Sequence, residues 1–172
     1  PQQIAKIEHF ISIDAMNIHA LGSKTINLLF DQLIIRDISD LYQLKIDQLT
    51  NLKGFGEKSK SVKKAQNIID GIEASKQNDF FKVLYGLGIR YVGKTVSMKL
   101  AHHFGSLEAL AQSSLANLLE LDEVGEKIAN SVYDYFHIEM NLALLENLKA
   151  SGLQFSMGVK EVDSHGLLDL TF

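Results

Sequence analysis

The 172-residue sequence contains no cysteine. This absence excludes disulfide scaffolds, thiolate nucleophiles, thiolate zinc sites and iron–sulfur clusters within the chain, and leaves only histidine and carboxylate side chains as possible metal ligands. The single proline is Pro1, so the interior lacks the residue that most strongly breaks helices. An uninterrupted run of about 18 apolar residues and a secretory leader are also missing. We therefore expect a cytoplasmic protein, nucleoid-associated if it binds DNA, that does not cross a membrane.

The composition is that of an ordinary globular chain, with 46% hydrophobic and 22% charged residues. The length fits one domain or two small ones. The formal net charge is −4, which argues against a protein that holds nucleic acid simply by being basic. The chain starts with Pro1 rather than Met, and we expect it to be a fragment of a longer protein.

Apolar residues recur at spacings of three and four along most of the chain, which places them on one face of a helix. Clear examples are Phe80, Phe81, Leu84 and Leu87, followed by Val96, Leu100 and Phe104. Alternation with a period of two is scarce before residue 152, so strands have little support. The sequence predicts an all-α fold in which these aromatic side chains belong to the core.

A short pattern of the form apolar-x-x-apolar-Gly separates the predicted helices four times, over residues 18–22, 52–56, 89–93 and 121–125. The final glycines are 34, 37 and 32 residues apart. In each copy a lysine follows within two positions of the glycine. The glycines are Gly22, Gly56, Gly93 and Gly125, and the lysines are Lys24, Lys58, Lys94 and Lys127.

A glycine directly before a helix lets a ligand approach the unpaired N–H groups of the first helical turn. Those donors and the helix dipole favour a phosphate oxygen, and a lysine in the same turn adds a full charge. Phosphate contacts carry no base information, so four copies predict sequence-independent binding along a duplex. The alternative is that the glycines only cap helical joints, as in α-solenoids. The candidate DNA-binding residues are Gly22, Ser23, Lys24, Gly54, Gly56, Lys58, Ser59, Arg90, Gly93, Lys94, Thr95, Gly125 and Lys127.

The run from Leu52 to Ser59, with its Gly-Phe-Gly centre, resembles the helix-hairpin-helix motif. The order of the four copies, the run Leu-Gly-Ile-Arg-Tyr-Val-Gly at 87–93 and the run Phe-Gly-Ser-Leu-Glu-Ala-Leu at 104–110 are similar to the helix-hairpin-helix domain of bacterial NAD-dependent DNA ligases. The resemblance implies a DNA-binding domain over residues 1–155, with four tandem motifs around 18–26, 52–60, 89–97 and 121–129. These motifs are expected to form two quasi-symmetric pairs, and residues 156–172 to be a linker toward a BRCT domain.

The resemblance also implies a place in an enzyme that seals nicks between a 3′-hydroxyl and a 5′-phosphate in DNA replication and repair, using NAD, magnesium and zinc. In that family the adenylated lysine lies in a Lys-x-Asp-Gly motif of another domain. This chain has only Lys45-Ile46-Asp47-Gln48, without the glycine, and Asp47 is expected to cap a helix. We therefore expect no catalytic residue, metal or cofactor within the chain.

The implied role is to hold the minor groove opposite a nick in double-stranded DNA. The implied partners are that DNA and the zinc finger, BRCT, adenylation and OB domains of the same ligase. Two other interpretations stay open: a helical module that docks proteins, or the tandem hairpin domain of another DNA repair protein.

Two features depart from the family pattern. The first hairpin glycine, present as Gly54 in the second copy, is replaced by Ala20, Tyr91 and Glu123 in the others. Residues 60–64 also form a lysine-rich insertion, which is either an additional phosphate contact or a solvated helix face.

Charge is distributed unevenly along the chain, with a sum of +4 over residues 46–112 and −8 over the remainder. The second and third copies are therefore expected to carry the positive surface. The fourth copy lies among acidic residues, and is expected to bind weakly through Gly125 and Lys127 or to face another domain.

Overall fold

The computed structural model describes residues 2–157, apart from the side chains of Lys58 and Ser59. Over this range the chain is helical and contains no β-strand, and its only bridge is an isolated antiparallel pairing of Ser106 with Ser156. The predicted all-α fold is confirmed for the described residues. The expected linker lies almost wholly outside them, at 158–172. None of the described helices is long and apolar enough to cross a membrane.

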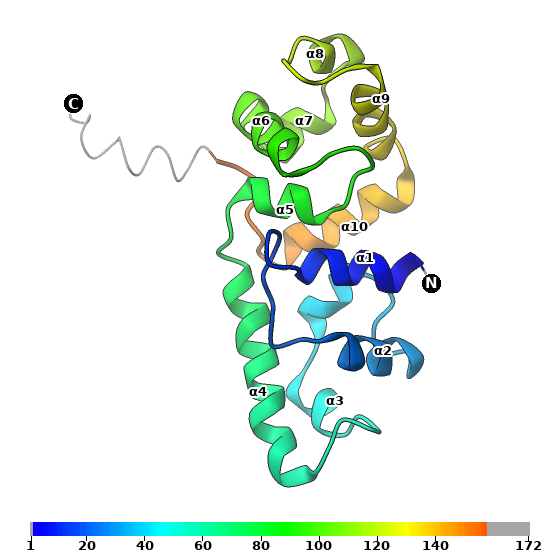
Figure 1. The fold of residues 1–172 in the computed structure, drawn as a ribbon, viewed down its shortest axis with the longest axis vertical. Coiled ribbons are helices and arrows are strands. Elements are labelled where there is room, and N and C mark those ends of the chain that lie inside the picture. Colours follow the sequence, from blue (N-terminus) through cyan, green and yellow to red (C-terminus); the bar gives the residue numbers. More distant parts are fainter. Residues whose placement is uncertain (1, 158–172) are drawn as a thin grey trace, which may run out of the picture.

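Ten α-helices and one 3-10 helix follow one another in the described part of the chain. They are α1 (Gln2–Ile11), α2 (Ser23–Asp31), η1 (Ile38–Gln43), α3 (Ile46–Thr50), α4 (Lys58–Ser75), α5 (Phe80–Gly86), α6 (Lys94–Phe104), α7 (Leu107–Ala111), α8 (Leu115–Leu119), α9 (Glu126–Tyr135) and α10 (Glu139–Ala150). In Figure 1, α2, α3 and α4 occupy the lower half, α6 to α9 the upper half, and α1, α5 and α10 lie across the middle.

The four predicted hairpins share one backbone structure. In each, the carbonyl of the first apolar residue accepts a hydrogen bond from the N–H three positions later. The pairs are Ile18 with Leu21 (3.1 Å), Leu52 with Phe55 (3.2 Å), Ile89 with Val92 (3.0 Å) and Leu121 with Val124 (3.2 Å). The helices that flank each hairpin pack together as α1 with α2, α3 with α4, α5 with α6 and α8 with α9. The sequence repeat is therefore a structural repeat.

A single apolar core runs through both halves of the molecule, from Ile7 to Leu153. At its centre α1 packs on α5, and η1 packs on α1, α4 and α10. Phe10 and Phe80 are almost fully buried. The rings of Phe10 and Tyr42 pack edge to face, with 6.2 Å between their centroids. The predicted core role of Phe80 is confirmed, and Phe81 and Phe104 pack against the same core while half-buried.

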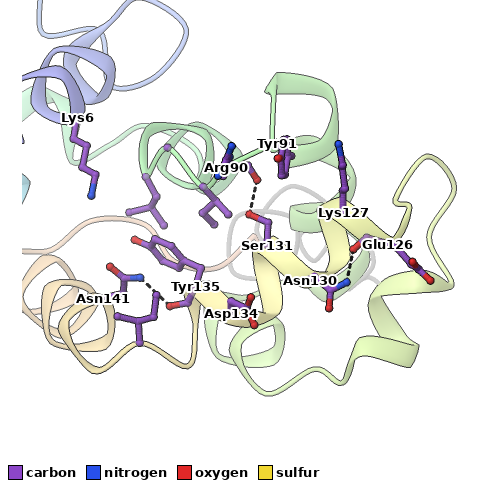
Figure 2. A pocket seen from close by; sticks show the side chains of 14 residues that line it. Lys6, Arg90, Tyr91, Glu126, Lys127, Asn130, Ser131, Asp134, Tyr135 and Asn141 are labelled. Atoms are coloured by element: carbon purple, nitrogen blue, oxygen red, sulfur yellow. Dashed lines mark hydrogen bonds between the residues drawn. The ribbon is translucent and has the colours of Figure 1, made fainter. Parts of the chain in front are cut away.

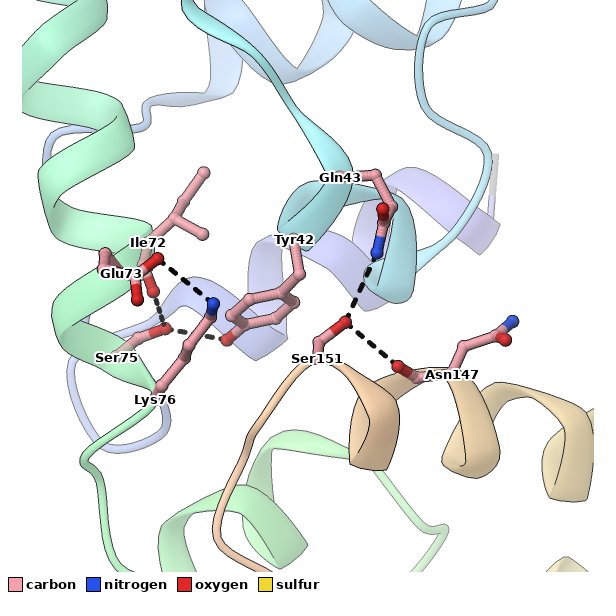
Figure 3. A network of polar contacts seen from close by, with 8 residues as sticks. All are labelled: Tyr42, Gln43, Ile72, Glu73, Ser75, Lys76, Asn147 and Ser151. Atoms are coloured by element: carbon pink, nitrogen blue, oxygen red, sulfur yellow. Dashed lines mark hydrogen bonds and ion pairs between the residues drawn. The ribbon is translucent and has the colours of Figure 1, made fainter.

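A polar network fastens η1 to α4 and α10 beside this core (Figure 3). Ser75 donates to the carbonyl of Ile72 at 2.6 Å, and the hydroxyl groups of Tyr42 and Ser75 share a hydrogen bond of 2.7 Å. On the other side Gln43 donates to Ser151 Oγ at 3.4 Å. Burial raises the pKa of Tyr42 to about 12, and the hydrogen bond with Ser75 opposes that rise in part.

Two local details differ from or extend the sequence expectation. The residue that caps α3 is Lys45, and Asp47 lies inside the first turn, so the expected Asp47 cap is wrong. After α10 the chain returns to α7, where Leu107 N–H donates to the Phe155 carbonyl at 2.8 Å and Met157 N–H donates to the Gly105 carbonyl at 2.9 Å. The described chain is therefore tied to the domain as far as Met157.

Candidate nucleic-acid interface

Three of the helices that follow a hairpin begin at a glycine. Gly22, Gly93 and Gly125 are the N-cap residues of α2, α6 and α9, and no side chain caps these helices. By contrast, α7 and α8 begin at Ser106 and Ser114, whose hydroxyls each accept a first-turn N–H at 3.1 Å. The first-turn N–H groups of the hairpin helices have no intrahelical acceptor, so they remain available to a ligand.

The fold itself does not require glycine at these three positions. Their φ angles lie between −97° and −87°, with ψ near 180°, which is extended backbone open to any residue. A Cβ atom built on Gly22, Gly93 or Gly125 would meet no other atom within 4 Å. What glycine provides here is open space in front of a helix N-terminus, and such a site attracts anions through its N–H groups and dipole.

The second hairpin differs in its helix start. Gly54 and Gly56 both adopt positive φ angles of 85° and 129°, and the N-cap of α4 is Glu57 rather than Gly56. The expectation that the helix follows the final glycine directly is therefore wrong for this copy, because one extra residue precedes the first turn. Lys58 and Ser59 begin α4, and their side chains lie outside the described part of the structure.

The lysine-rich segment 60–64 forms the third to seventh positions of α4. Lys64 turns back to the hairpin, with Nζ donating to the Phe55 carbonyl at 3.3 Å and lying 4.4 Å from the centroid of the Phe55 ring. Ser61 is buried and donates to the Glu57 carbonyl at 2.6 Å. Lys60 and Lys63 are exposed. The insertion therefore contains both a support for the hairpin and a solvated face.

The predicted cationic residues have different neighbours. Lys24 is exposed and, among the described residues, forms no ion pair. Lys94 Nζ lies 3.4 Å from a carboxylate oxygen of Asp14. Lys127 Nζ lies 5.5 Å from the centroid of the Tyr91 ring, and Arg90 Cζ lies 5.0 Å from the same centroid. The Asp14 contact joins residues 80 positions apart and has no signal in the sequence.

The remaining predicted residues lie at the same helix starts. Ser23 is the first residue of α2, and its hydroxyl donates to Glu8 Oε2 at 2.7 Å. Thr95 is exposed in the first turn of α6. The backbone carbonyl of Arg90 accepts a hydrogen bond from Ser131 Oγ of α9 at 2.6 Å.

At the tips of the third and fourth hairpins, the residues that replace glycine keep the backbone conformation that glycine favours. Tyr91 and Glu123 adopt positive φ angles of 68° and 70°, the same left-handed region as Gly54. Ala20 of the first copy does not. A side chain in this region costs roughly 1–2 kcal/mol relative to the right-handed conformation. Ala20, Tyr91 and Glu123 align equally with Gly54, so the structure is needed to tell the two strained tips from the unstrained one.

A cleft of about 620 Å³ lies between the third hairpin and α9, with Lys6 of α1 and Asn141 of α10 at its far end (Figure 2). Arg90, Tyr91 and Lys127 stand together at its rim, and Glu126 and Asp134 of α9 also line it. The described residues contain no group of three histidines or carboxylates placed to hold a metal ion.

Comparison with known families agrees with the repeat. The family described as a SAM-like helix-hairpin-helix tandem matches residues 12–74, and the family described as a helix-hairpin-helix motif matches residues 82–145. The protein is thus built from helix-hairpin-helix motifs.

Its relatives narrow the assignment. The chain is 48% identical over 162 residues to a DNA ligase of Cytophaga hutchinsonii, 46% over 165 residues to one of Phocaeicola vulgatus, and 41% over 171 residues to one of Aquifex aeolicus. These alignments cover 94%, 96% and 99% of the chain, but only 23%, 24% and 23% of the relatives. The chain belongs to the helix-hairpin-helix domains of DNA ligases, and it spans about a quarter of the length of these curated relatives.

Proposed function

We propose that this domain binds double-stranded DNA without sequence preference, through backbone phosphates on the two sides of the minor groove. The observation that carries the proposal is the set of three glycine-capped helix starts, which expose N–H donors and leave room that the fold does not need. Phosphate is the DNA group that such a helix start can recognise, because it is an anion and its oxygens can reach the N–H groups of the protein backbone.

The binding residues of the proposal are those at or beside the helix starts and hairpin tips. They are Gly22, Ser23, Lys24, Gly54, Gly56, Lys58, Ser59, Arg90, Gly93, Lys94, Thr95, Gly125 and Lys127. Each phosphate is taken by first-turn N–H groups, and the nearby lysine adds charge. Because these groups touch only the sugar-phosphate backbone, affinity depends on salt concentration and hardly on base sequence.

Contacts between the motifs support their arrangement as two pairs, the first with the second and the third with the fourth. In the first pair, Gln32 at the end of α2 exchanges two hydrogen bonds with the backbone of Lys53 in the second hairpin. In the second pair, Lys99 of α6 lies 3.6 Å from Glu123 in the fourth hairpin. Each pair thus joins the helix after one hairpin to the tip of the other.

The reciprocal contacts run the other way. A Cβ on Gly71 of α4 would lie 3.5 Å from Ile18 of the first hairpin, and Ser131 of α9 donates to Arg90 of the third. Two pairs of this kind would place two helix starts on each flank of the groove.

We further propose that the domain serves an NAD-dependent DNA ligase that seals nicks between a 3′-hydroxyl and a 5′-phosphate during replication and repair. In that enzyme the domain is a non-catalytic clamp on nicked duplex. NAD, magnesium and zinc act in the adenylation, OB and zinc-finger domains, and a BRCT domain follows. The basis is the similarity to curated DNA ligases over nearly the whole chain.

The test is a fluorescence-anisotropy titration of the full chain with intact and nicked duplexes of several unrelated sequences, over a series of salt concentrations. The proposal expects similar affinity for all sequences and a linear fall of log K with log salt. Strong dependence on base sequence would refute phosphate recognition. A chain that bound a protein partner and had no affinity for any duplex would instead be a docking module.

A further inference from the structure

Two side chains connect the third and fourth hairpins, and both come from residues with strained backbone conformations. Tyr91 extends from the tip of the third hairpin to Lys127 of the fourth motif, and Glu123 extends from the tip of the fourth to Lys99 of the third. Both tip residues have left-handed backbone, where glycine would be free of strain and where the second hairpin has Gly54. Strain of this kind persists where the side chain has a use.

The use of Tyr91 follows from what surrounds its ring. The ring is 48% exposed, and Figure 2 shows it between the side chains of Arg90 and Lys127. Its centroid lies 5.0 Å from the guanidinium carbon and 5.5 Å from the ammonium nitrogen. A cation within about 6 Å of an aromatic ring is attracted to the electron-rich face.

Without the Tyr91 ring, the acidic neighbours of Lys127 would compete with DNA for its ammonium group. Asp122, Glu123 and Glu126 all lie within five positions of it, yet among the described residues Lys127 forms no ion pair. The Tyr91 ring gives its ammonium another place, at the start of α9 and beside the third hairpin. The Ser131 to Arg90 hydrogen bond of 2.6 Å fixes the two elements at this point.

We propose that Tyr91 is a positioning residue that holds Arg90 and Lys127 over one rim, so that the third and fourth hairpins bind DNA phosphates as one unit. This inference rests on the proposed function. It explains how the fourth motif takes part in binding although the segment 113–150 carries seven acidic residues and two basic ones. Tyr91 of the third motif thus positions Lys127, the one lysine in the first turn of the acidic fourth motif.

The experiment compares three substitutions of Tyr91 in the full chain. Tyr91→Phe keeps the ring; Tyr91→Gly removes both ring and strain; Tyr91→Asn removes the ring but tolerates left-handed backbone. Affinity for a short intact duplex and the melting temperature are measured for each. We expect Tyr91→Gly to melt higher than the wild type and yet to bind about two- to five-fold more weakly for each cation released. Tyr91→Asn should lose the same affinity, and Tyr91→Phe should retain it.

A double-mutant cycle with Lys127→Met separates positioning from simple ring contact with DNA. If the ring acts through Lys127, Tyr91→Gly costs less affinity in the Lys127→Met background than in the wild type. Equal costs in both backgrounds, or undiminished binding by Tyr91→Gly and Tyr91→Asn, would overturn the inference. These outcomes are distinct from failure of the proposed function, in which the wild type itself shows no salt-dependent binding to the duplex.

Discussion

Replacement of the glycine that caps α6, Gly93→Ser, should improve the fold and damage DNA binding together. Serine suits the N-cap because the backbone there has φ −90° and ψ −170°, and its Cβ would meet no atom within 4 Å. Its hydroxyl would accept a first-turn N–H, as Ser106 and Ser114 do at 3.1 Å in α7 and α8. We expect the free energy of unfolding to rise by a few tenths of a kcal/mol.

The same hydroxyl would occupy a donor that the proposal assigns to phosphate, and its Cβ would narrow the approach. Loss of one hydrogen bond to a charged group costs about 1.5 kcal/mol or more, which is roughly a tenfold loss of affinity. Urea unfolding measures the first effect, and anisotropy titration with duplex DNA measures the second.

The matched control is Ser114→Gly at the start of α8, a helix start that follows no hairpin and is not among the proposed phosphate sites. It should lower the free energy of unfolding by a few tenths of a kcal/mol and leave DNA affinity unchanged. If Gly93→Ser bound DNA as tightly as the wild type while capping α6, the helix starts would not be phosphate sites, and the glycines would be capping residues only.

Three further outcomes test other features. Lys94→Ala should weaken duplex binding and reduce the slope of log K against log salt by about 0.9, and Lys127→Ala should have a smaller effect; equal losses from both variants in a salt series would contradict this ranking. Asp14→Asn should free Lys94 from its ion pair and strengthen duplex binding by up to about five-fold. The free energy of unfolding should fall between pH 10 and pH 12, by at most about 1.4 kcal/mol per pH unit, because the buried Tyr42 keeps its proton in the folded state and loses it when unfolded. Unfolding of Tyr42→Phe over the same pH range should lack this component. Ser97→Ala should raise the free energy of unfolding by about 1 kcal/mol, because Ser97 Oγ is buried with no hydrogen-bond partner among the described residues. The fourth motif has Ala129, also buried, at the equivalent position. A urea midpoint below that of the wild type would refute this prediction.

The repeat, the helical class and the positions of the helix starts could be predicted from the sequence because they depend on local rules. Apolar spacing defines a helix face within one element, and a glycine that precedes a lysine-containing turn defines where the next helix begins. The rule failed at the second hairpin, where Glu57 rather than Gly56 is the N-cap. There the two positive φ angles of Gly54 and Gly56 lengthen the turn, and a consensus of five positions cannot show that.

The contacts that set the electrostatics of the site could not be predicted, because they join residues that are distant in the sequence. Lys94 meets Asp14 across 80 positions, and Arg90 meets Ser131 across 41. Net charge per segment, which ranked the hairpins, treats Lys94 as a free cation and Lys127 as one lysine among acids. The structure adds a carboxylate beside the first and an aromatic ring beside the second.

The central layer of α1, α5, η1 and α10 decides how this protein could be divided. The two family matches, at 12–74 and 82–145, suggest two halves that could be expressed separately. Yet α1 comes first in the chain and packs on α5, while α10 comes last and packs on η1. A cut between α4 and α5 would strip both pieces of their shared centre and expose Phe10 and Phe80 to water. We therefore expect the four hairpins to unfold together, although each repeats the same backbone structure, and the whole tandem to be the smallest piece of this chain that folds on its own.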